Sequence, residues 1–231
     1  MTKITIAIDG FSSTGKSTVA KQLAKHLGYV YVDTGAMYRA VTFYAMQKKL
    51  ISTKAFDVAS LIKQLPNIRV HFVFNEDVGF AEVYLNDLNV ETEIRSLDVS
   101  SFVSKVAAIS EVRQKLVEQQ QKLGAEKGVV MDGRDIGTVV FPDAELKLFM
   151  TASAETRAKR RYDELLERGD RVAYEAVLKN VQERDYIDSN REDSPLMKAD
   201  DAIEIDNSNM SLKEQFDKIL HLVNITLTNV K

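Results

Sequence analysis

The 231-residue chain has no cysteine and only three prolines. Without cysteine it cannot form a disulfide scaffold, an iron-sulfur centre, a thiolate zinc site or a cysteine nucleophile. The scarcity of proline excludes a collagenous or proline-rich disordered chain. A chain without cysteine has no disulfides, which is typical of proteins in a reducing compartment. We therefore expect a cytoplasmic protein.

Long hydrophobic runs and an excess of positive charge are also missing. No segment has the length needed to span a bilayer, and the apolar run before Asp9 lacks the length and cleavage site of a signal peptide. Lys and Arg number 31 against 34 Asp and Glu, which gives a net charge of -3. We therefore expect no membrane and no nucleic acid as partner, and any anion must be bound locally. The 45% hydrophobic content suffices for one compact domain.

Glycine is also scarce, at 10 residues, so glycines in an ordered pattern carry weight. The segment Gly10-Phe-Ser-Ser-Thr-Gly-Lys-Ser17 matches the phosphate-binding pattern G-x-x-x-x-G-K-[ST], between an expected strand and an expected helix. Its backbone N–H groups face a phosphate, Lys16 reaches the β and γ oxygens, and Ser17 ligates Mg²⁺. The chemistry makes no use of the Phe11 side chain. The predicted ATP-binding residues are Gly10, Phe11, Ser12, Ser13, Thr14, Gly15, Lys16, Ser17 and Thr18.

Strands and helices alternate along most of the chain. The hydrophobic pattern predicts strands at 4–8, 29–33, 128–132, 146–151 and 202–205, and helices at 16–27, 36–50, 111–123, 153–190 with a break near 169, and from 211 onward. Residues 68–90 differ, because they read as strand, turn, strand, an antiparallel insert. This order predicts an α/β fold with a parallel sheet of about five strands flanked by helices, and ligands at the carboxyl ends of the strands.

Arginine is concentrated in one part of the chain. Guanidinium groups bind phosphate in a planar, bidentate manner, so this enrichment favours phosphate recognition. Acidic neighbours such as Asp163 and Glu167 indicate that about half of these arginines form ordinary salt bridges on a helix face. Three of them are spaced to share one helical face that can close over a transferring phosphoryl group, namely Arg157, Arg160 and Arg161. The whole set is Arg134, Arg157, Arg160, Arg161, Arg168, Arg171, Arg184 and Arg191.

A regulatory GTPase would carry an Asn-Lys-x-Asp guanine-binding motif, and none is present. Instead, polar segments follow the strands, and together they resemble the bacterial cytidylate kinase family. The resemblance covers essentially the whole chain. It rests on GxxxxGKS at 10–17, DTGAMYR at 33–39, the insert near 68–90, SKVAAISEVR at 104–113, DGRDIGTVVFPDA at 132–144 and RDYIDSNR at 184–191.

This resemblance implies a nucleoside monophosphate kinase with a phosphate loop. Its single domain would comprise a core (about 1–35, 95–152 and 195–231), a monophosphate-binding lobe containing the strand insert (about 36–94) and a helical lid (about 153–194). The implied reaction transfers a phosphoryl group from ATP, with Mg²⁺, to CMP or dCMP. The implied catalytic residues are Lys16, Arg134, Arg157, Arg161 and Arg191.

The resemblance also assigns substrate contacts. The residues assigned to the base are Ser104, Arg113 and Asp135. Asp188 with Arg184 goes to the pentose, and Thr34 supplies a hydroxyl where the family often has serine. The residues assigned to the monophosphate are Arg39, Arg134 and Arg191. The residues assigned to the base match cytosine, whose O2 and N3 accept hydrogen bonds and whose 4-amino group donates one. Ser104 and Arg113 can donate to these acceptors, and Asp135 can accept from the amino group.

Two alternatives are also compatible with the sequence. One is another nucleotide kinase, such as an adenylate or uridylate kinase, against which the insert and the base set speak. The other is a nucleotide-switched binding protein, which the missing guanine motif and the arginine-rich lid disfavour. No obligate interface is evident in the sequence, so we expect a monomer.

Overall fold

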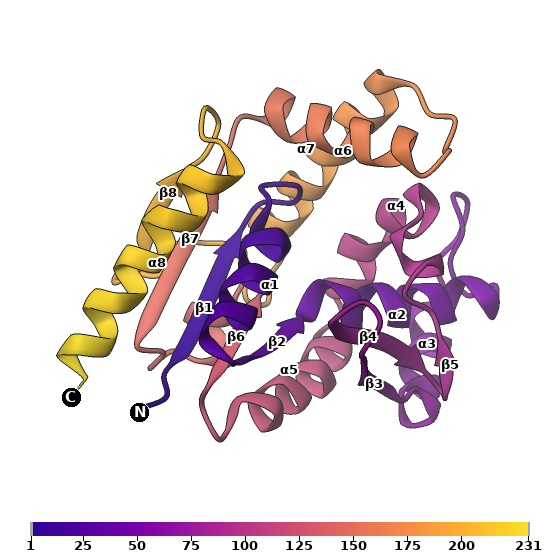
Figure 1. Cartoon of the computed structure of the whole chain (residues 1–231). Helices are drawn as coiled ribbons and strands as arrows, with labels where there is room; N and C mark the ends of the chain where they lie inside the picture. The colour runs from indigo at the N-terminus through magenta and orange to yellow at the C-terminus, as the bar shows by residue number, and fades with distance from the viewer. Residues whose placement is uncertain (1, 231) are drawn as a thin grey trace. The chain divides into compact units, whose positions relative to one another are not determined.

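The computed structural model describes residues 2–230. The chain divides into two compact units, Met1–Val32 with Leu123–Lys231, and Asp33–Lys122, whose residues can be found in Figure 1 from its colour bar. We describe each unit by itself, the first with its larger sheet and the second with its smaller one.

The first unit is built on a five-stranded sheet in the order β2-β6-β1-β7-β8. Strand β1 runs parallel to both of its neighbours, and β7 runs parallel to β8. The sheet confirms the predicted α/β fold. Its strands are β1 (Thr5–Gly10), β2 (Val30–Asp33), β6 (Val129–Asp132), β7 (Leu146–Thr151) and β8 (Ile203–Asp206).

Alternation along β1 separates the two faces of this sheet. Ile4, Ile6 and Ile8 are fully buried in a core shared with α1 (Lys16–Leu27) and α8 (Leu212–Asn229). Because successive strand residues point to opposite faces, Asp9 lies on the other face. A short π-helical turn, Ile136–Val140, packs against β1. The strand therefore delivers an acidic side chain to the face away from the main hydrophobic core.

The helices of this unit begin and end where local signals predict. Helix α1 opens directly after Gly15 and ends at Gly28, whose φ of 66° is the left-handed conformation that glycine adopts readily. Helix α8 starts with a complete capping box between Ser211 and Glu214. The polar tract forms two helices that pack against each other, α6 (Ala154–Glu167) and α7 (Tyr174–Asn190), drawn in orange in Figure 1.

The second unit combines helices with a small antiparallel sheet. Strands β3 (Val70–Asn75), β4 (Phe80–Leu85) and β5 (Leu88–Asn89) form this sheet, which confirms the predicted insert. The helices are α2 (Thr34–Gln47), α3 (Val58–Gln64), α4 (Leu97–Ala107) and α5 (Ser110–Gly124). Helix α2 starts two residues before its predicted position, because the Asp33 side chain caps it by accepting the Ala36 N–H at 2.8 Å.

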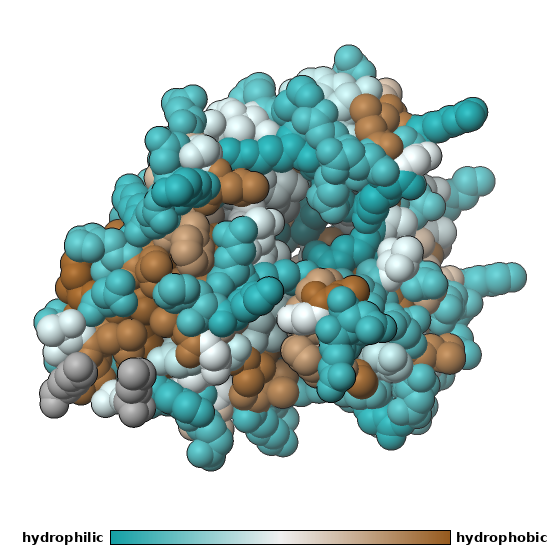
Figure 2. All heavy atoms as spheres, in the orientation of Figure 1, coloured by the Kyte–Doolittle hydropathy of each residue, from teal (hydrophilic) through white to brown (hydrophobic). Residues whose placement is uncertain are grey.

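No helix among the described residues is long and apolar enough to cross a membrane. On the face drawn in Figure 2, hydrophobic side chains gather over α8, whose exposed apolar residues include Leu212 and Ile225.

Candidate active site

The segment Gly10–Ser17 forms a loop between β1 and α1, as its pattern predicts. Three of its residues have positive φ, namely Gly10 at 141°, Ser13 at 59° and Gly15 at 88°. A Cβ on Gly10 would lie 2.0 Å from the Met150 carbonyl oxygen, so only glycine fits between β1 and β7. The left-handed turns curl the chain into a concave backbone whose N–H groups can surround an anion.

Lys16 is buried at the mouth of this loop, with 5% of its surface exposed. Its Nζ donates to the Phe11 carbonyl oxygen at 2.6 Å and to Thr14 Oγ1 at 3.3 Å. Burial, together with nearby Arg134, lowers the pKa of Lys16 to about 7, although Asp132 and Asp9 act in the opposite direction. A phosphate placed here would restore the charged form of the ammonium group.

Asp9 faces the start of the π-helical turn. Its Oδ1 accepts the Ile136 N–H at 2.8 Å, and its Oδ2 accepts the Gly137 N–H at 2.7 Å. Burial raises the pKa of Asp9 to about 7, despite these two hydrogen bonds and the nearby Lys16. The carboxyl group thereby joins the end of β1 to the chain that follows Asp135.

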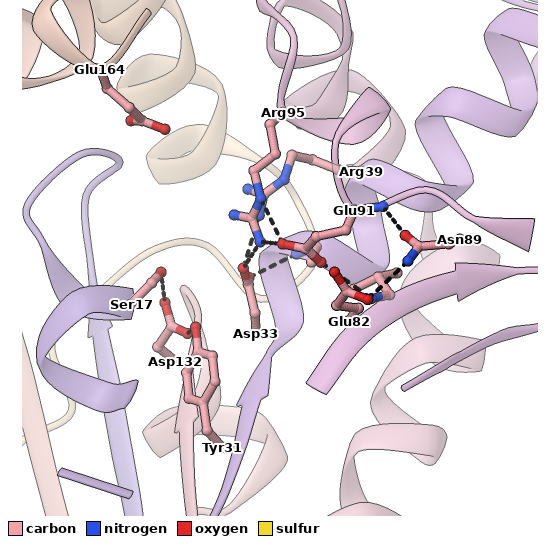
Figure 3. A network of polar contacts seen from close by, with 12 residues as sticks. Ser17, Tyr31, Asp33, Arg39, Glu82, Asn89, Glu91, Arg95, Asp132 and Glu164 are labelled. Atoms are coloured by element: carbon pink, nitrogen blue, oxygen red, sulfur yellow. Dashed lines mark hydrogen bonds and ion pairs between the residues drawn. The ribbon is translucent and has the colours of Figure 1, made fainter. Parts of the chain in front are cut away.

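Two hydroxyl groups meet the Asp132 carboxylate where β6 ends, as Figure 3 shows. Ser17 Oγ donates to Asp132 Oδ2 at 2.9 Å, and the Tyr31 hydroxyl donates to Asp132 Oδ1 at 2.8 Å. A hydroxyl beside a carboxylate is the set of hard oxygen donors that Mg²⁺ prefers. Ser17 and Asp132 therefore fit the metal that the phosphate loop implies.

Four residues predicted to contact the acceptor nucleotide lie together in the first unit. Arg134 Nε donates to Asp188 Oδ2 at 2.9 Å. Arg191 Nη2 lies 3.7 Å from Asp135 Oδ1, and both side chains are buried. Arg184, also predicted, lies close enough to Lys16 to lower its pKa. The carboxylate partners of Arg134 and Arg191 restrict the orientation of these two guanidinium groups.

The three arginines of the predicted lid face have different partners. Arg157 is buried and forms a bidentate pair with Asp185, with N–O distances of 3.0 and 2.6 Å. Arg160 donates to the carbonyl oxygen of Asn207 at 2.8 Å, whereas Arg161 pairs with Glu164 at 3.0 Å.

In the second unit, one buried carboxylate holds two arginines, as Figure 3 shows. Arg39 Nη2 lies 3.0 Å and Arg95 Nη2 lies 3.1 Å from the same oxygen, Asp33 Oδ2. Arg95 also pairs with Glu91 at 2.5 Å. The shared carboxylate fixes the Arg39 guanidinium, which the sequence predicts to bind the monophosphate. It also holds Arg95, for which the sequence predicts no role.

The other three predicted substrate residues of this unit are also buried: Thr34, Ser104 and Arg113. Arg113 donates from Nη1 to the Ala107 carbonyl oxygen at 3.2 Å, and its guanidinium lies 5.6 Å from the centre of the Tyr38 ring. Ser104 Oγ has no hydrogen-bond partner among residues 2–230. A buried hydroxyl in this state costs free energy unless a ligand completes it.

A strand-loop-helix phosphate loop, a buried lysine and a serine-carboxylate pair define a phosphate-loop nucleotide-binding protein of the α/β class. Comparison with known proteins then gives the family. The family model described as cytidylate kinase matches residues 6–225. The chain therefore belongs to the cytidylate kinase family, and it is a transferase of the nucleoside monophosphate kinase type.

Curated relatives named cytidylate kinase agree with this assignment. One from Flavobacterium psychrophilum is 68% identical over 97% of this chain and 99% of its own. One from Flavobacterium johnsoniae is 70% identical over 97% of each chain. A third, from Phocaeicola vulgatus, is 58% identical over 93% of this chain and 94% of its own.

Proposed function

We propose that this protein transfers the γ-phosphoryl group of ATP to CMP or dCMP, giving ADP and the corresponding diphosphate. The observation that carries the proposal is the buried Lys16 at the mouth of the phosphate loop, in a chain that belongs to the cytidylate kinase family. Phosphoryl transfer needs little covalent help from a protein, so the residues act by positioning the two nucleotides and neutralising charge.

The loop residues Gly10–Thr18 bind the donor. Backbone N–H groups hold the β-phosphate, and Lys16 takes up a proton as the phosphates arrive, since its pKa of about 7 lies near neutral pH. Ser17 and Asp132 would hold Mg²⁺, which when bound spreads the negative charge of the phosphate oxygens. Arg134, Arg157, Arg161 and Arg191 complete the proposed catalytic set around the transferring group.

The acceptor contacts follow from the chemistry of cytosine. Ser104 and Arg113 donate to the two acceptor atoms of the base, and Asp135 accepts from its 4-amino group. Asp188 and Arg184 hold the pentose. The Thr34 hydroxyl is a further proposed contact to the substrate. The monophosphate goes to Arg39, Arg134 and Arg191. The Ser104 hydroxyl has no hydrogen-bond partner within the described part of the chain, which supports this scheme, because a bound base would supply one.

The proposal also assigns roles to segments. Residues 36–94 bind the monophosphate and residues 153–194 act as the lid that excludes water, because hydrolysis of ATP would otherwise compete with transfer. We further propose a monomeric, cytoplasmic enzyme. Light scattering of the purified protein tests the monomer, and a dimer mass would refute it.

The deciding experiment measures ADP formation from ATP and Mg²⁺ with CMP, UMP, AMP or no acceptor. We expect CMP to be preferred over UMP by about a hundredfold in kcat/KM, because uracil presents an acceptor where Asp135 needs a donor. Equal turnover of UMP would overturn the base contacts. Hydrolysis without an acceptor would instead favour a nucleotide-switched binding protein.

A substitution tests the base contact directly. Asp135→Ala should weaken CMP binding far more than ATP binding, by about a hundredfold for CMP, and should narrow the preference for CMP over UMP. Isothermal titration calorimetry with each nucleotide measures both affinities. Asp143→Ala is the matched control, since Asp143 is exposed in the same sequence block. Equal losses for CMP and ATP would remove Asp135 from the base site.

A further inference from the structure

The phosphate loop is held from outside through its carbonyl oxygens. Arg157 Nη1 donates to the Ser12 carbonyl oxygen at 3.3 Å. Asn207 Nδ2 donates to the Thr14 carbonyl oxygen at 2.6 Å, and Arg160 Nη1 reaches the same oxygen at 3.5 Å. Helix α6 and the segment after β8 thus contact two peptide groups of the loop.

These contacts determine where the loop N–H groups point. A peptide group is planar and trans, so its C=O and N–H point in opposite directions. The group that carries the Ser12 oxygen also carries the Ser13 N–H, and the group that carries the Thr14 oxygen also carries the Gly15 N–H. Holding each oxygen from outside therefore turns the paired N–H toward the other side, where a phosphate loop binds its anion.

The loop needs such support, because Ser13 has a φ of 59°. This left-handed conformation is strained for a non-glycine residue, so surrounding contacts must maintain it. The Ser12 side chain does not contribute, since its buried Oγ has no hydrogen-bond partner among residues 2–230. The contact from Arg157 to the Ser12 backbone is thus a principal restraint on this peptide.

Arg157 is itself fixed on every side. Its Nε donates to the Ala152 carbonyl oxygen at 2.9 Å, and its centre lies 5.1 Å from the centre of the Phe11 ring. The Phe11 ring meets the Phe149 ring edge-on at 6.1 Å between centres. The Phe11 side chain therefore has a structural use, as one wall against which the guanidinium rests.

The remaining partner of Arg157 is Asp185 on α7, which accepts two hydrogen bonds in the bidentate geometry that fixes both the position and the plane of a guanidinium. The other two acceptors, at Ala152 and Ser12, are uncharged carbonyl groups. Asp185 therefore balances the charge of a cation that is 4% exposed. A buried cation deprived of its carboxylate would shift toward solvent or take up another partner.

We propose that Asp185 is a positioning residue of the phosphate loop: it holds Arg157 against the Ser12 carbonyl group and so orients the Ser13 N–H toward the donor phosphate. This inference rests on the proposed function only in naming ATP as the anion that the loop binds. Asp185 also lies next to Arg184 and three residues before Asp188, so α7 carries both this support and the proposed pentose contacts.

The test compares Asp185→Asn with Glu183→Gln by titration calorimetry. The control changes the same helix, where Glu183 forms an exposed pair with Lys179 at 3.8 Å. We expect Asp185→Asn to weaken MgATP binding by about tenfold or more, as for a lost charge-assisted hydrogen bond, and to change CMP binding by less than about twofold. Glu183→Gln should leave both affinities unchanged. Unchanged ATP affinity in Asp185→Asn, or an equal loss for CMP, would overturn the proposal.

A second readout does not depend on turnover or on ATP. The backbone amide resonance of Ser13 in the free protein should move in Asp185→Asn and stay in place in Glu183→Gln. If the unmodified protein did not bind ATP, the proposed function would fail, while this resonance would still decide the role of Asp185.

Should Asp185→Asn not fold, two other variants, Asp185→Glu and Arg157→Lys, replace it in the ATP-binding measurement. The glutamate keeps the charge and should retain most of the ATP affinity, whereas the lysine loses the bidentate contact and should not; equal affinities in the two would refute the inference.

Discussion

The phosphate-loop region and the three-stranded insert place their charged side chains in opposite surroundings. Near the loop, Asp9, Lys16 and Arg157 are each no more than 5% exposed. On the insert, Arg69 and Asp87 form a pair whose side chains are 65% and 70% exposed. The insert also exposes large apolar residues, such as Phe74 at 65%.

The difference shows that the surroundings of a charge, and not the charge itself, indicate its use. An exposed ion pair contributes about 0–1 kcal/mol to stability, because water already solvates both partners. A buried charge loses its hydration, so it needs ion-pair or hydrogen-bond partners, or else its pKa shifts. Shifted pKa values of this kind are typical of functional sites. The region where charge is costly is thus the one that we expect to perform the chemistry.

The largest expected effect is on Lys16. Lys16→Ala should lower kcat/KM with CMP by at least about a hundredfold, because one charge that stabilises the transferring phosphoryl group is lost. The fold should persist, since removal of a buried cation leaves no charge to compensate at that position. A coupled assay of ADP formation and a thermal melt measure the two effects. Near-normal turnover would remove Lys16 from the phosphate site.

The next effect is on the pH dependence of stability through Asp9. Its pKa is about 7 in the folded protein and near 3.8 when unfolded, so the folded state binds the extra proton between these values. The free energy of unfolding should therefore fall as pH rises from about 4 to 7, and the stability that the proton provides is lost above the folded pKa. Asp9→Asn carries no titrating group and should lack this fall.

Urea unfolding of both proteins at pH 5 and pH 8 measures this difference. We expect the stability of the Asn variant relative to the unmodified protein to rise by at least about 1.4 kcal/mol between the two pH values, the equivalent of a single pKa unit. The constant cost of an amide that cannot accept both N–H groups cancels in the comparison. Parallel stability curves would show that the Asp9 pKa is not raised.

The smallest effect belongs to the insert. Arg69→Ala should change the free energy of unfolding by less than about 1 kcal/mol and leave CMP turnover intact, since its partner Asp87 stays solvated. Thermal melts and the coupled assay are sufficient for this test. A large loss of stability or of activity would break the contrast between the two regions.

Local signals in the sequence predict much of the fold. The bounds of α1 and β7 are as expected, because glycine punctuates the helix and an apolar run defines the strand. Helices α3 and α4 were not predicted. Helix α4 is rich in serine and valine, which are weak helix formers, and burial of Phe102 and Val103 stabilises it in place of propensity. The capping residue Ser96, which accepts the Val99 N–H at 3.4 Å, and Asp98 in the first turn are local signals that could have located it.

The residues of the candidate site also separate into those that short sequence segments predict and those that only the folded chain shows. The loop motif and the residues proposed to bind the acceptor nucleotide are predicted from patterns within short segments. The partners that fix them are not, because they act across the chain: Ser17 and Asp132 are 115 positions apart, and Asp9 and Ile136 are 127 apart. Asp185 lies within the RDYIDSNR segment, but the resemblance gives it no role, and Asn207 lies outside all of the matching segments. Only the folded arrangement shows that each is tied to the phosphate loop.

The outside contacts on the phosphate loop also set an order of events during synthesis. Arg157 and Asn207 follow their loop partners, Ser12 and Thr14, by 145 and 193 positions. A chain is made from its N-terminus, so the loop leaves the ribosome long before the groups that orient its peptides exist. A nascent fragment that carries the whole nucleotide motif therefore does not yet carry the nucleotide site, which is completed when β8 and the segment after it have been added.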